Sequence, residues 1–398
     1  MSQSNIGNER EKETYTHPRA ALSSQSRGRE RELPDDGIRS EYQRDVHRIT
    51  YSQPFRRLRH KTQVFYAPQN DHICTRLEHS VHVANAARTV ARALRLNEDL
   101  AEAIGLGHDL GHAPFGHHGE EILNRLCKEN DIEQGFYHEV NSLRQVTRLA
   151  MFDRPNGEDP GLNLSYEVRD GIVSHDGEEF TSRTIRAFEG DKDLHSIRRK
   201  HDAHNPITLE GCIIRVVDKI AYAGRDFADG VRAKLIKWND MPGVCRTHLG
   251  RDNGEIVGKL LTDLIENSRD EESSVQLSQE KFEVMNELIK FNYARVYKHP
   301  EVLKCKEQAR TCLRSVFYLL MDILHQTDRF HTEKGVKSLA ETEILSVFRE
   351  FFTDMKYSND EDSARVAMDF LSGATDQFVI RTVREILRPE VLIPPQIV

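Results

Sequence analysis

Apolar residues recur at helical spacing through most of the chain from Glu41 onward. The clearest example lies in segment 75–96, where one helical face carries apolar residues three or four positions apart. These residues are Val83, Ala86, Val90 and Leu94. The next segment begins at Asn97, a good helix N-cap, and reaches Gly111, where a helix is expected to stop. The pattern predicts two consecutive helices joined by a short turn.

The later part of the chain has the same periodicity, and the alternation typical of strands is scarce. We expect further helices over 209–229, 254–267, 278–297, 300–326, 339–357 and 360–387. Two stretches, 151–163 and 188–206, have loop-like compositions. The pattern therefore predicts an all-α protein in which helices pack on one another.

Residues 1–40 differ from the rest because they are polar and lack apolar periodicity. Such a segment buries too little apolar surface to hold a fixed structure on its own. We therefore expect a flexible N-terminal arm that becomes ordered only by docking to a partner. Residues 41–398 are expected to form a single, mostly helical catalytic domain.

The composition is that of a globular protein without a membrane segment. No run approaches the roughly 18 apolar residues that a membrane span needs, and the polar N-terminus lacks the apolar region of a signal peptide. We therefore expect a cytoplasmic protein. Its six cysteines form no CxxC pair, which favours reduced thiols over disulfides or a cysteine zinc site. The formal net charge of −8 argues against nucleic-acid binding by the whole surface.

Candidate chemistry gathers in GHDLGHAPFGHHGE, residues 107–120, which holds four histidines and two acids between glycines and a proline. His79 comes four residues before Val83 and therefore shares the apolar face of its helix. His108 falls on the inward face of the next helix, with Asp109 beside it. A third helix carries a polar stripe next to core residues, formed by Asp218, Tyr222, Asp226 and Asp229.

These groups admit two interpretations. Inward histidines are commonly hydrogen-bonded core residues, and an acidic stripe is commonly a solvated helix face. A metal site is the alternative, because buried carboxylates are costly unless a cation or hydrogen bonds compensate them. Two imidazoles and two carboxylates would suit Mn²⁺, Fe²⁺, Co²⁺ or Zn²⁺, and less specifically Mg²⁺. Spacing alone does not separate the two interpretations.

Five segments, taken in order, are similar to the successive blocks of the deoxyguanosinetriphosphate triphosphohydrolase family of HD-domain phosphohydrolases. They are SEYQRDVHRITYSQPFRRLRHKTQVF (40–65), TRLEHSVHVANAART (75–89), GLGHDLGHAPFGHHGE (105–120), GLNLSYEVRDGIVSH (161–175) and DFLSGATDQF (369–378). The resemblance implies an HD-domain helical bundle, with its core at about 75–230 and additional C-terminal helices at about 231–398. It also implies metal-dependent hydrolysis of deoxynucleoside triphosphates, dGTP or a broader set, to a deoxynucleoside and tripolyphosphate.

The resemblance also assigns roles to individual residues. The family's metal ligands match His79, His108, Asp109 and Asp218, its catalytic loop matches His112, His117 and Glu120, and its phosphate and sugar contacts match Gln63, Arg76, Lys219, Tyr222 and Asp226. The pair His138-Glu139 in FYHEVNS replaces the commoner bacterial HNxQS form and is similar to the catalytic pair of animal dNTP triphosphohydrolases. AYAGRDF likewise departs from AYxxHDxxD, so the preferred base stays open.

For this reaction we expect a water activated by the metal, Mn²⁺ or Mg²⁺ first, to attack the α-phosphorus while the sugar 5′-oxygen leaves. His117 is the candidate general acid, and Glu120, three residues later, would orient its imidazole. His112 and His138 would steady phosphate oxygens or assist proton transfer. The cations expected to compensate the triphosphate charge are Arg76 and Lys219.

The segment FRRLRHK, residues 55–61, is either a solvated basic surface or a contact for a nucleotide or single-stranded DNA. His82 and His118 are expected to pack or to face solvent. The resemblance further implies a homo-oligomer, commonly a hexamer, with an allosteric dNTP or single-stranded DNA as further partners. Two other functions stay open: an HD phosphohydrolase acting on nucleoside monophosphates or guanosine alarmones, and a nucleotide or nucleic-acid sensor with a vestigial site.

Overall fold

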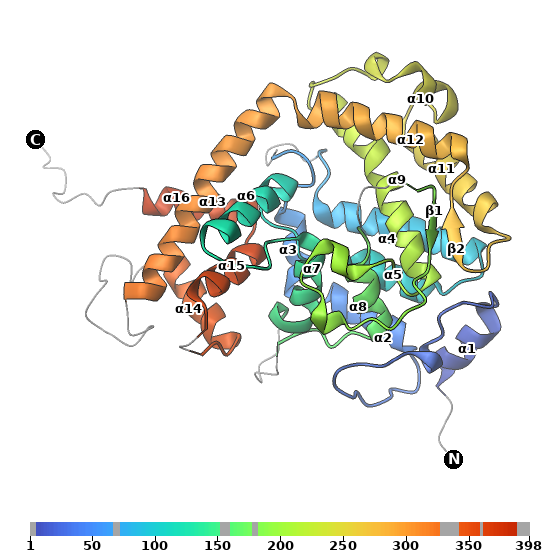
Figure 1. Cartoon of the computed structure of the whole chain (residues 1–398), viewed down its shortest axis with the longest axis horizontal. Helices are drawn as coiled ribbons and strands as arrows, with labels where there is room; N and C mark the ends of the chain where they lie inside the picture. Colours follow the sequence, from blue (N-terminus) through green and yellow to red (C-terminus); the bar gives the residue numbers. More distant parts are fainter. Residues whose placement is uncertain are drawn as a thin grey trace, which may run out of the picture.

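The computed structural model describes residues 5–66, 72–151, 160–176, 182–326, 342–358 and 361–387, and helices dominate this part of the chain (Figure 1). The α-helices are α1 (Ile6–Thr14), α2 (Glu41–Thr50), α3 (Gln53–Arg57), α4 (Arg76–Ala93), α5 (Glu98–Gly107), α6 (Gly116–Glu129), α7 (His138–Arg144), α8 (Tyr166–Val173), α9 (Leu209–Arg232), α10 (Gly243–His248), α11 (Asn253–Ser268), α12 (Gln279–Asn292), α13 (Pro300–Gln326), α14 (Glu343–Asp354), α15 (Ser363–Gly373) and α16 (Asp376–Ile386). Two short strands, β1 (Thr184–Arg186) and β2 (Ser274–Gln276), pair antiparallel. The prediction of an all-α fold is confirmed. Within the described residues, no helix has both the length and the apolar character that crossing a membrane requires.

Most of the predicted helices are present. The segments 209–229 and 300–326 form α9 and α13. The segment 360–387 forms two helices, α15 and α16, instead of one. The break lies just before Thr375, whose hydroxyl accepts a hydrogen bond from the backbone N of Phe378 at 3.2 Å and so begins a new helix. The N-cap at Thr375 therefore starts a second helix, although the apolar periodicity that predicted one helix continues across this point.

Other predicted segments differ only at their ends. The segment 278–297 forms α12 and then the π-helical turn η7 (Tyr293–Tyr297). The segment 339–357 contains α14, and its first three residues lie outside the described residues. The predicted loop 188–206 contains two short 3-10 turns. Most of the other predicted loop, 151–163, lies outside the described residues.

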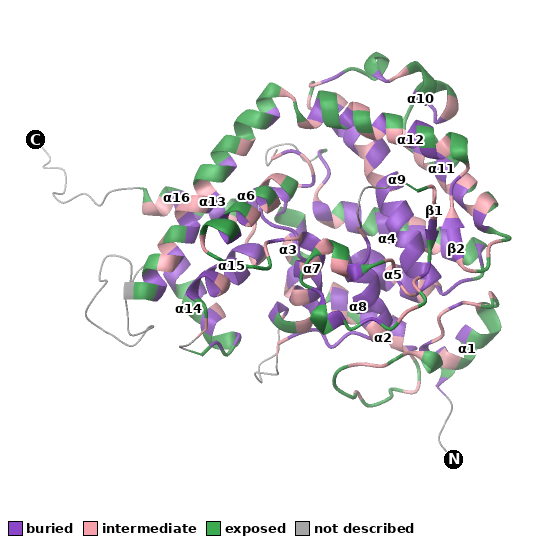
Figure 2. Cartoon of the chain, viewed as in Figure 1, coloured by how far each residue is buried: buried purple, intermediate pink, exposed green. Residues whose placement is uncertain are grey.

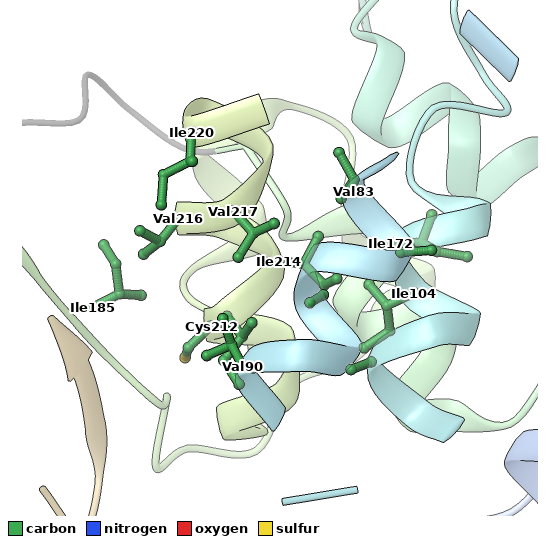
Figure 3. Close-up of a cluster of buried hydrophobic side chains, with 14 of the residues drawn as sticks. Val83, Val90, Ile104, Ile172, Ile185, Cys212, Ile214, Val216, Val217 and Ile220 are labelled. Atoms are coloured by element: carbon green, nitrogen blue, oxygen red, sulfur yellow. The ribbon is translucent and has the colours of Figure 1, made fainter. Parts of the chain in front are cut away.

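Helices α4, α5, α8 and α9 pack on one another and form the most deeply buried part of the molecule (Figure 2). Figure 3 shows their branched side chains meeting between the helices, among them Val83, Val90, Ile104, Ile172, Ile214 and Val217. Each side chain of this size contributes about 1.5–3 kcal/mol when it is fully buried. At the start of α4, Thr75 and Glu78 form a capping box that satisfies free backbone N–H groups. This packing fixes the helices that carry the candidate metal ligands.

A second apolar cluster lies between α6 and the C-terminal helices α13, α14, α15 and α16. It joins the first part of the molecule through polar contacts at Lys61 and Asp376. The Lys61 ammonium donates to the backbone oxygens of His112 and Ser372, the latter at 2.8 Å. The Asp376 carboxylate accepts from the backbone N of Phe115 at 2.8 Å. The turn after α5 is therefore held from both sides.

The N-terminal segment differs from the flexible arm expected from its composition. Residues 5–40 include α1 and contact the rest of the chain through buried acids. Glu11 accepts from the backbone N of Ser23 at 2.7 Å and from Asn97 Nδ2 at 3.2 Å. Glu210, on α9, accepts from the backbone N of Ala21 at 3.1 Å. These contacts are hydrogen bonds, which a search for apolar periodicity does not detect.

Candidate functional site

Four of the predicted site residues meet where α4, α5 and α9 approach one another. His79 lies in the first turn of α4, His108 directly follows α5, Asp109 is the next residue, and Asp218 lies in the middle of α9. All four side chains are buried. His79 Nε2 is 2.9 Å from Asp218 Oδ1 and 3.9 Å from Asp109 Oδ2. The structure therefore gathers two imidazoles and two carboxylates in one buried cluster.

His108 shows whether this cluster fits a metal. Its Nδ1 lies 2.8 Å from the backbone oxygen of Gly105, which can only accept, so Nδ1 carries the proton. Its Nε2 has no hydrogen-bond partner among the described residues and lies 3.5 Å from Asp109 Oδ1 and 3.8 Å from Asp218 Oδ1. The Nε2 atom, which has no hydrogen-bond partner among the described residues, thus faces two carboxylates. A cation between them satisfies all three groups, and the Gly105 contact is the kind that orients a metal-binding histidine.

Both carboxylates are held in their charged form. Burial favours the neutral acid at Asp109, but His108, His112 and Arg76 outweigh it and keep the pKa of Asp109 well below its ordinary value. At Asp218, burial acts in the same way, and the hydrogen bond from His79 lowers the pKa below its ordinary value. The cluster therefore offers two anionic oxygen ligands at neutral pH, which suits a divalent cation.

A cavity of about 410 Å³ opens beside this cluster. All five residues expected to bind phosphate and sugar line it: Gln63, Arg76, Lys219, Tyr222 and Asp226. The amide oxygen of Gln63 is enclosed and has no hydrogen-bond partner within the described chain. Arg76 donates from Nη1 to Asp109 at 2.7 Å, while its Nε and Nη2 have no partner among the described residues. The cavity wall therefore presents free hydrogen-bonding groups to a ligand.

On α9, the other predicted contacts are partly engaged inside the protein. Lys219 Nζ lies 3.0 Å from Asp176 Oδ1 and 5.9 Å from the centre of the Tyr222 ring. Asp226 accepts a hydrogen bond from the Tyr297 hydroxyl. Burial raises the pKa of Asp226 to about 7, so this carboxyl group titrates near neutrality.

The predicted catalytic histidines line the same cavity. The rings of His112 and His138 stack with centres 3.9 Å apart. Glu120 Oε2 lies 3.0 Å from His138 Nδ1 and 3.6 Å from His117 Nδ1. Glu120 was expected to orient His117, but it contacts His138 more closely. Burial opposes a charge on His138, yet Glu139 and Glu120 outweigh it and raise the pKa of His138 to about 10.

Helix α7 braces the turn that carries these groups. Ser142 Oγ accepts from the backbone N of Gly111 at 2.8 Å and donates to the backbone oxygen of His108 at 2.7 Å. A Cβ on Gly111 would lie 2.1 Å from the backbone N of Ser142, so only glycine permits this approach. Phe115 has a φ of 63°, which turns the chain into α6. The glycine-containing loop is therefore both tightly packed and part of the site.

Several cavity residues were not predicted. His175 follows α8, and its ring lies 5.0 Å from that of His108 and 5.3 Å from that of His138. Its position three residues after Ile172 places it on the inward face of that helix, which is a signal available in the sequence. Lys290, Tyr293 and Tyr297 also line the cavity, at the i, i+3 and i+7 positions of one stripe.

Some singled-out residues lie elsewhere. Asp229 accepts from the backbone N of Cys74 at 3.2 Å and pairs with Arg232, so this end of the acidic stripe is structural. His82 is exposed and His118 lines a different cavity. All six cysteines are unpaired.

Comparison with known proteins agrees with this architecture. Residues 76–223 match the HD domain and residues 275–385 match the phosphohydrolase-associated domain. A protein of Caldanaerobacter subterraneus subsp. tengcongensis is 38% identical over 94% of this chain and 92% of its own length. Relatives from Desulfatibacillum aliphaticivorans and Clostridium tetani are 35% and 33% identical, over 94% of this chain and 95% and 94% of their own lengths. All three are named deoxyguanosinetriphosphate triphosphohydrolase-like protein, and the chain accordingly belongs to this family of HD-domain phosphohydrolases.

Proposed function

We propose that this protein hydrolyses deoxynucleoside triphosphates, dGTP or a broader set, to the deoxynucleoside and tripolyphosphate in a metal-dependent reaction. The observation that carries the proposal is the unpartnered His108 Nε2 facing two buried carboxylates at the wall of a cavity lined by cations. Membership of a family named for a triphosphohydrolase supports the substrate class.

The metal would be held by His79, His108, Asp109 and Asp218. When bound, a divalent metal supplies a Lewis acid that polarises a phosphoryl oxygen and lowers the pKa of a coordinated water. Mn²⁺ and Mg²⁺ are our first candidates, and Fe²⁺, Co²⁺ and Zn²⁺ also suit the mixed nitrogen and oxygen ligands.

The triphosphate needs positive groups, and three of those that line the cavity adjoin the candidate metal ligands or the predicted catalytic residues. Arg76 has two unused donor positions, and a guanidinium binds phosphate oxygens with two parallel hydrogen bonds. Lys219 would exchange its contact with Asp176 for a phosphate oxygen. His138, whose raised pKa keeps it protonated at neutral pH, adds a third charge. These groups would hold the leaving polyphosphate and the reacting phosphorus in place.

The departing 5′-oxygen needs a proton, and His117 is our candidate to donate it. Its side chain is 62% exposed and adjoins Glu120 at the cavity wall, so it can regain a proton from solvent. Glu120 would hold His138 and so order the pair of stacked rings. Gln63, with its unpaired amide oxygen, would accept a hydrogen bond from a sugar hydroxyl.

The test is to incubate the purified protein with each dNTP and each ribonucleoside triphosphate, singly and mixed, with Mn²⁺ or Mg²⁺. Anion-exchange chromatography then separates tripolyphosphate from pyrophosphate and phosphate. We expect the wild type to release tripolyphosphate and free deoxynucleoside in equal amounts. His108→Ala should release about 1000-fold less of both products. His117→Ala should release about 100-fold to 10,000-fold less.

Other products would contradict the proposal. Phosphate or pyrophosphate without tripolyphosphate would favour a monophosphate or alarmone hydrolase, and binding without turnover would favour a sensor. Dependence on mixed dNTPs would show whether the implied allosteric dNTP exists, and sedimentation would test the implied homo-oligomer; both stay predictions.

A further inference from the structure

A second cavity, of about 390 Å³, lies between α3, the turn after α7, and helices α14, α15 and α16. None of its lining residues belongs to the catalytic cavity. Arg57, Gln145, Asp369 and Gly373 line it together with the rings of Phe351, Phe370 and Phe378. The buried part of this lining, which holds Gln145 and Asp369, is called the inner end. An inner end of polar groups with an aromatic wall is typical of a small-molecule site.

Arg57 is the unusual residue of this cavity. Its Nε is enclosed, and no hydrogen bond or ion pair engages its guanidinium within the described residues. A Cβ on Gly373 would lie 3.5 Å from Arg57 Nη2, so a glycine leaves room beside the charge. Burial alone lowers the pKa of Arg57 to about 10, which leaves it charged at neutral pH. Arg57 is half-buried, with its Nε enclosed. An unpaired cation that is partly withdrawn from water is costly, and an anionic ligand would offset that cost.

The surroundings supply no free acid at the inner end. Lys61 is buried nearby, and its ammonium is bound to two backbone oxygens and to no carboxylate. Asp369, the carboxylate at the inner end, already accepts from Arg144 Nε at 2.7 Å and from the Tyr357 hydroxyl at 2.6 Å. It also pairs with Arg365 at 3.2 Å. Asp369 is therefore not available to Arg57.

A second polar group at the inner end is also unused. Gln145 is 1% exposed, and its Oε1 has no partner among the described residues. Its Nε2 donates to Ser372 Oγ at 3.2 Å, which fixes the amide with Oε1 free. The exposed acids Glu350 and Asp354 also line the cavity, as does Arg381, which pairs with Glu343 at 2.7 Å. One unpaired guanidinium and two exposed acids in the lining suit a ligand with a single anionic group and hydrogen-bond donors elsewhere.

We propose that this cavity binds a nucleoside monophosphate. The phosphate would pair with Arg57, the base would pack against the phenylalanine rings, and Gln145 would accept from a ligand hydroxyl. The exposed acids Glu350 and Asp354 would favour the amino groups of a base and disfavour a longer polyphosphate chain. The site stands apart from the proposed reaction, because its residues and its ligand charge differ from those of the catalytic cavity.

The test is calorimetric titration of the full-length, metal-loaded protein with inorganic phosphate, adenosine, and the ribo- and deoxyribonucleoside monophosphates. Arg57→Met removes the guanidinium, Arg310→Met is the matched control at a 45% exposed arginine on α13, and Lys219→Met disables the catalytic cavity. We expect at least one monophosphate to bind the wild type, about tenfold or more weaker binding to Arg57→Met, and unchanged binding to the other two variants. Arg57→Met should also melt at a higher temperature without ligand, because it loses an unpaired, half-buried charge.

The proposal fails if no monophosphate binds, if Arg57→Met binds as well as the wild type, or if Lys219→Met abolishes binding. Inorganic phosphate binding as tightly as every monophosphate would also overturn it, because the aromatic wall would then have no role. Should Arg57→Met fail to fold, Gly373→Val offers a second test, since its side chain would occupy the space beside Nη2; unchanged binding to that variant would overturn the proposal.

Discussion

Two buried clusters contain similar charged groups but differ in whether the protein itself balances them. Around Asp369, Arg144 and Tyr357 donate to the carboxylate and Arg365 pairs with it at 3.2 Å, so every charge has a partner. Around Asp109 and Asp218, Arg76, His79 and His112 contact the carboxylates, but His108 Nε2 has no hydrogen-bond partner among the described residues. A cluster that is complete within the chain stabilises the fold, whereas an incomplete one needs a ligand. The comparison separates structural from functional acids by their partners and not by their burial.

The sharpest test applies the same change to both clusters, starting with Asp218→Asn. We expect turnover to fall about 1000-fold or more, equivalent to about 4 kcal/mol, because a charged metal ligand is lost. Metal-free stability should fall less than this, since an amide can still hydrogen-bond His79. Steady-state kinetics and urea unfolding of the metal-free protein measure the two effects. An enzyme with wild-type kcat would show that the incomplete cluster is not the metal site.

The matched change, Asp369→Asn, should have the opposite profile. It leaves Arg144 and Arg365 without a buried counter-charge, so we expect the free energy of unfolding to fall by about 3 kcal/mol. Turnover per folded molecule should stay within a few-fold of the wild type. Tyr357→Phe, which removes one donor only, is the milder control and should cost about 1 kcal/mol. A large loss of kcat at constant stability would remove the distinction between the clusters.

Metal addition should separate the clusters in a third way. With Mn²⁺ at 100 times its dissociation constant, the wild type should gain about 2.7 kcal/mol of stability, because only the folded protein assembles the ligands. Asp369→Asn should gain the same amount from its lower starting point, and Asp218→Asn should gain much less. Thermal melts with and without chelator provide the measurement. Equal gains in all three proteins would place the metal outside the incomplete cluster.

Glu210 is an intermediate case, since it accepts from the backbone N of Asn97 and of Ala21 but has no cation partner in the part of the chain that the structure describes. Burial raises the pKa of Glu210 to about 7, above its value of 4.5 when unfolded. Between these values the folded protein binds the extra proton, so the free energy of unfolding should fall as pH rises from 4.5 to 7. Glu210→Gln should remove this dependence and be more stable at pH 8 by about 2 kcal/mol. Urea unfolding across this range tests it; parallel pH profiles would contradict the prediction.

The sequence predicted the helices well because helical periodicity is local. Val83 and Val90 recur at the spacing that the α4 face requires, whatever packs against it. The order of residues 5–40 was missed because it depends on hydrogen bonds to Glu11 and Glu210. Such bonds join segments far apart in the chain and leave no periodic pattern.

The sequence likewise predicted only part of the candidate site. The spacing placed His79 and His108 inward and indicated Asp109 and Asp218 as candidate partners. The family resemblance then assigned all four as metal ligands, and the structure brings them together. The position of His175 three residues after Ile172 was enough to predict that it faces inward. The role of Arg57 in lining a cavity could not be predicted in this way. The sequence shows Arg57 within a basic run, and its enclosure depends on helices some 300 residues later.

Lys61 precedes both family domains and touches each of them, since its ammonium binds His112 in one and Ser372 in the other. An HD fragment cut off before residue 275 would keep all four metal ligands and yet leave this ammonium with half of its partners. The two domains are therefore not interchangeable modules. A chimera with the C-terminal half of a relative should fold only where the residues that face Lys61 and Asp376 match between the two halves. We therefore expect the two domains to change together in evolution at this contact.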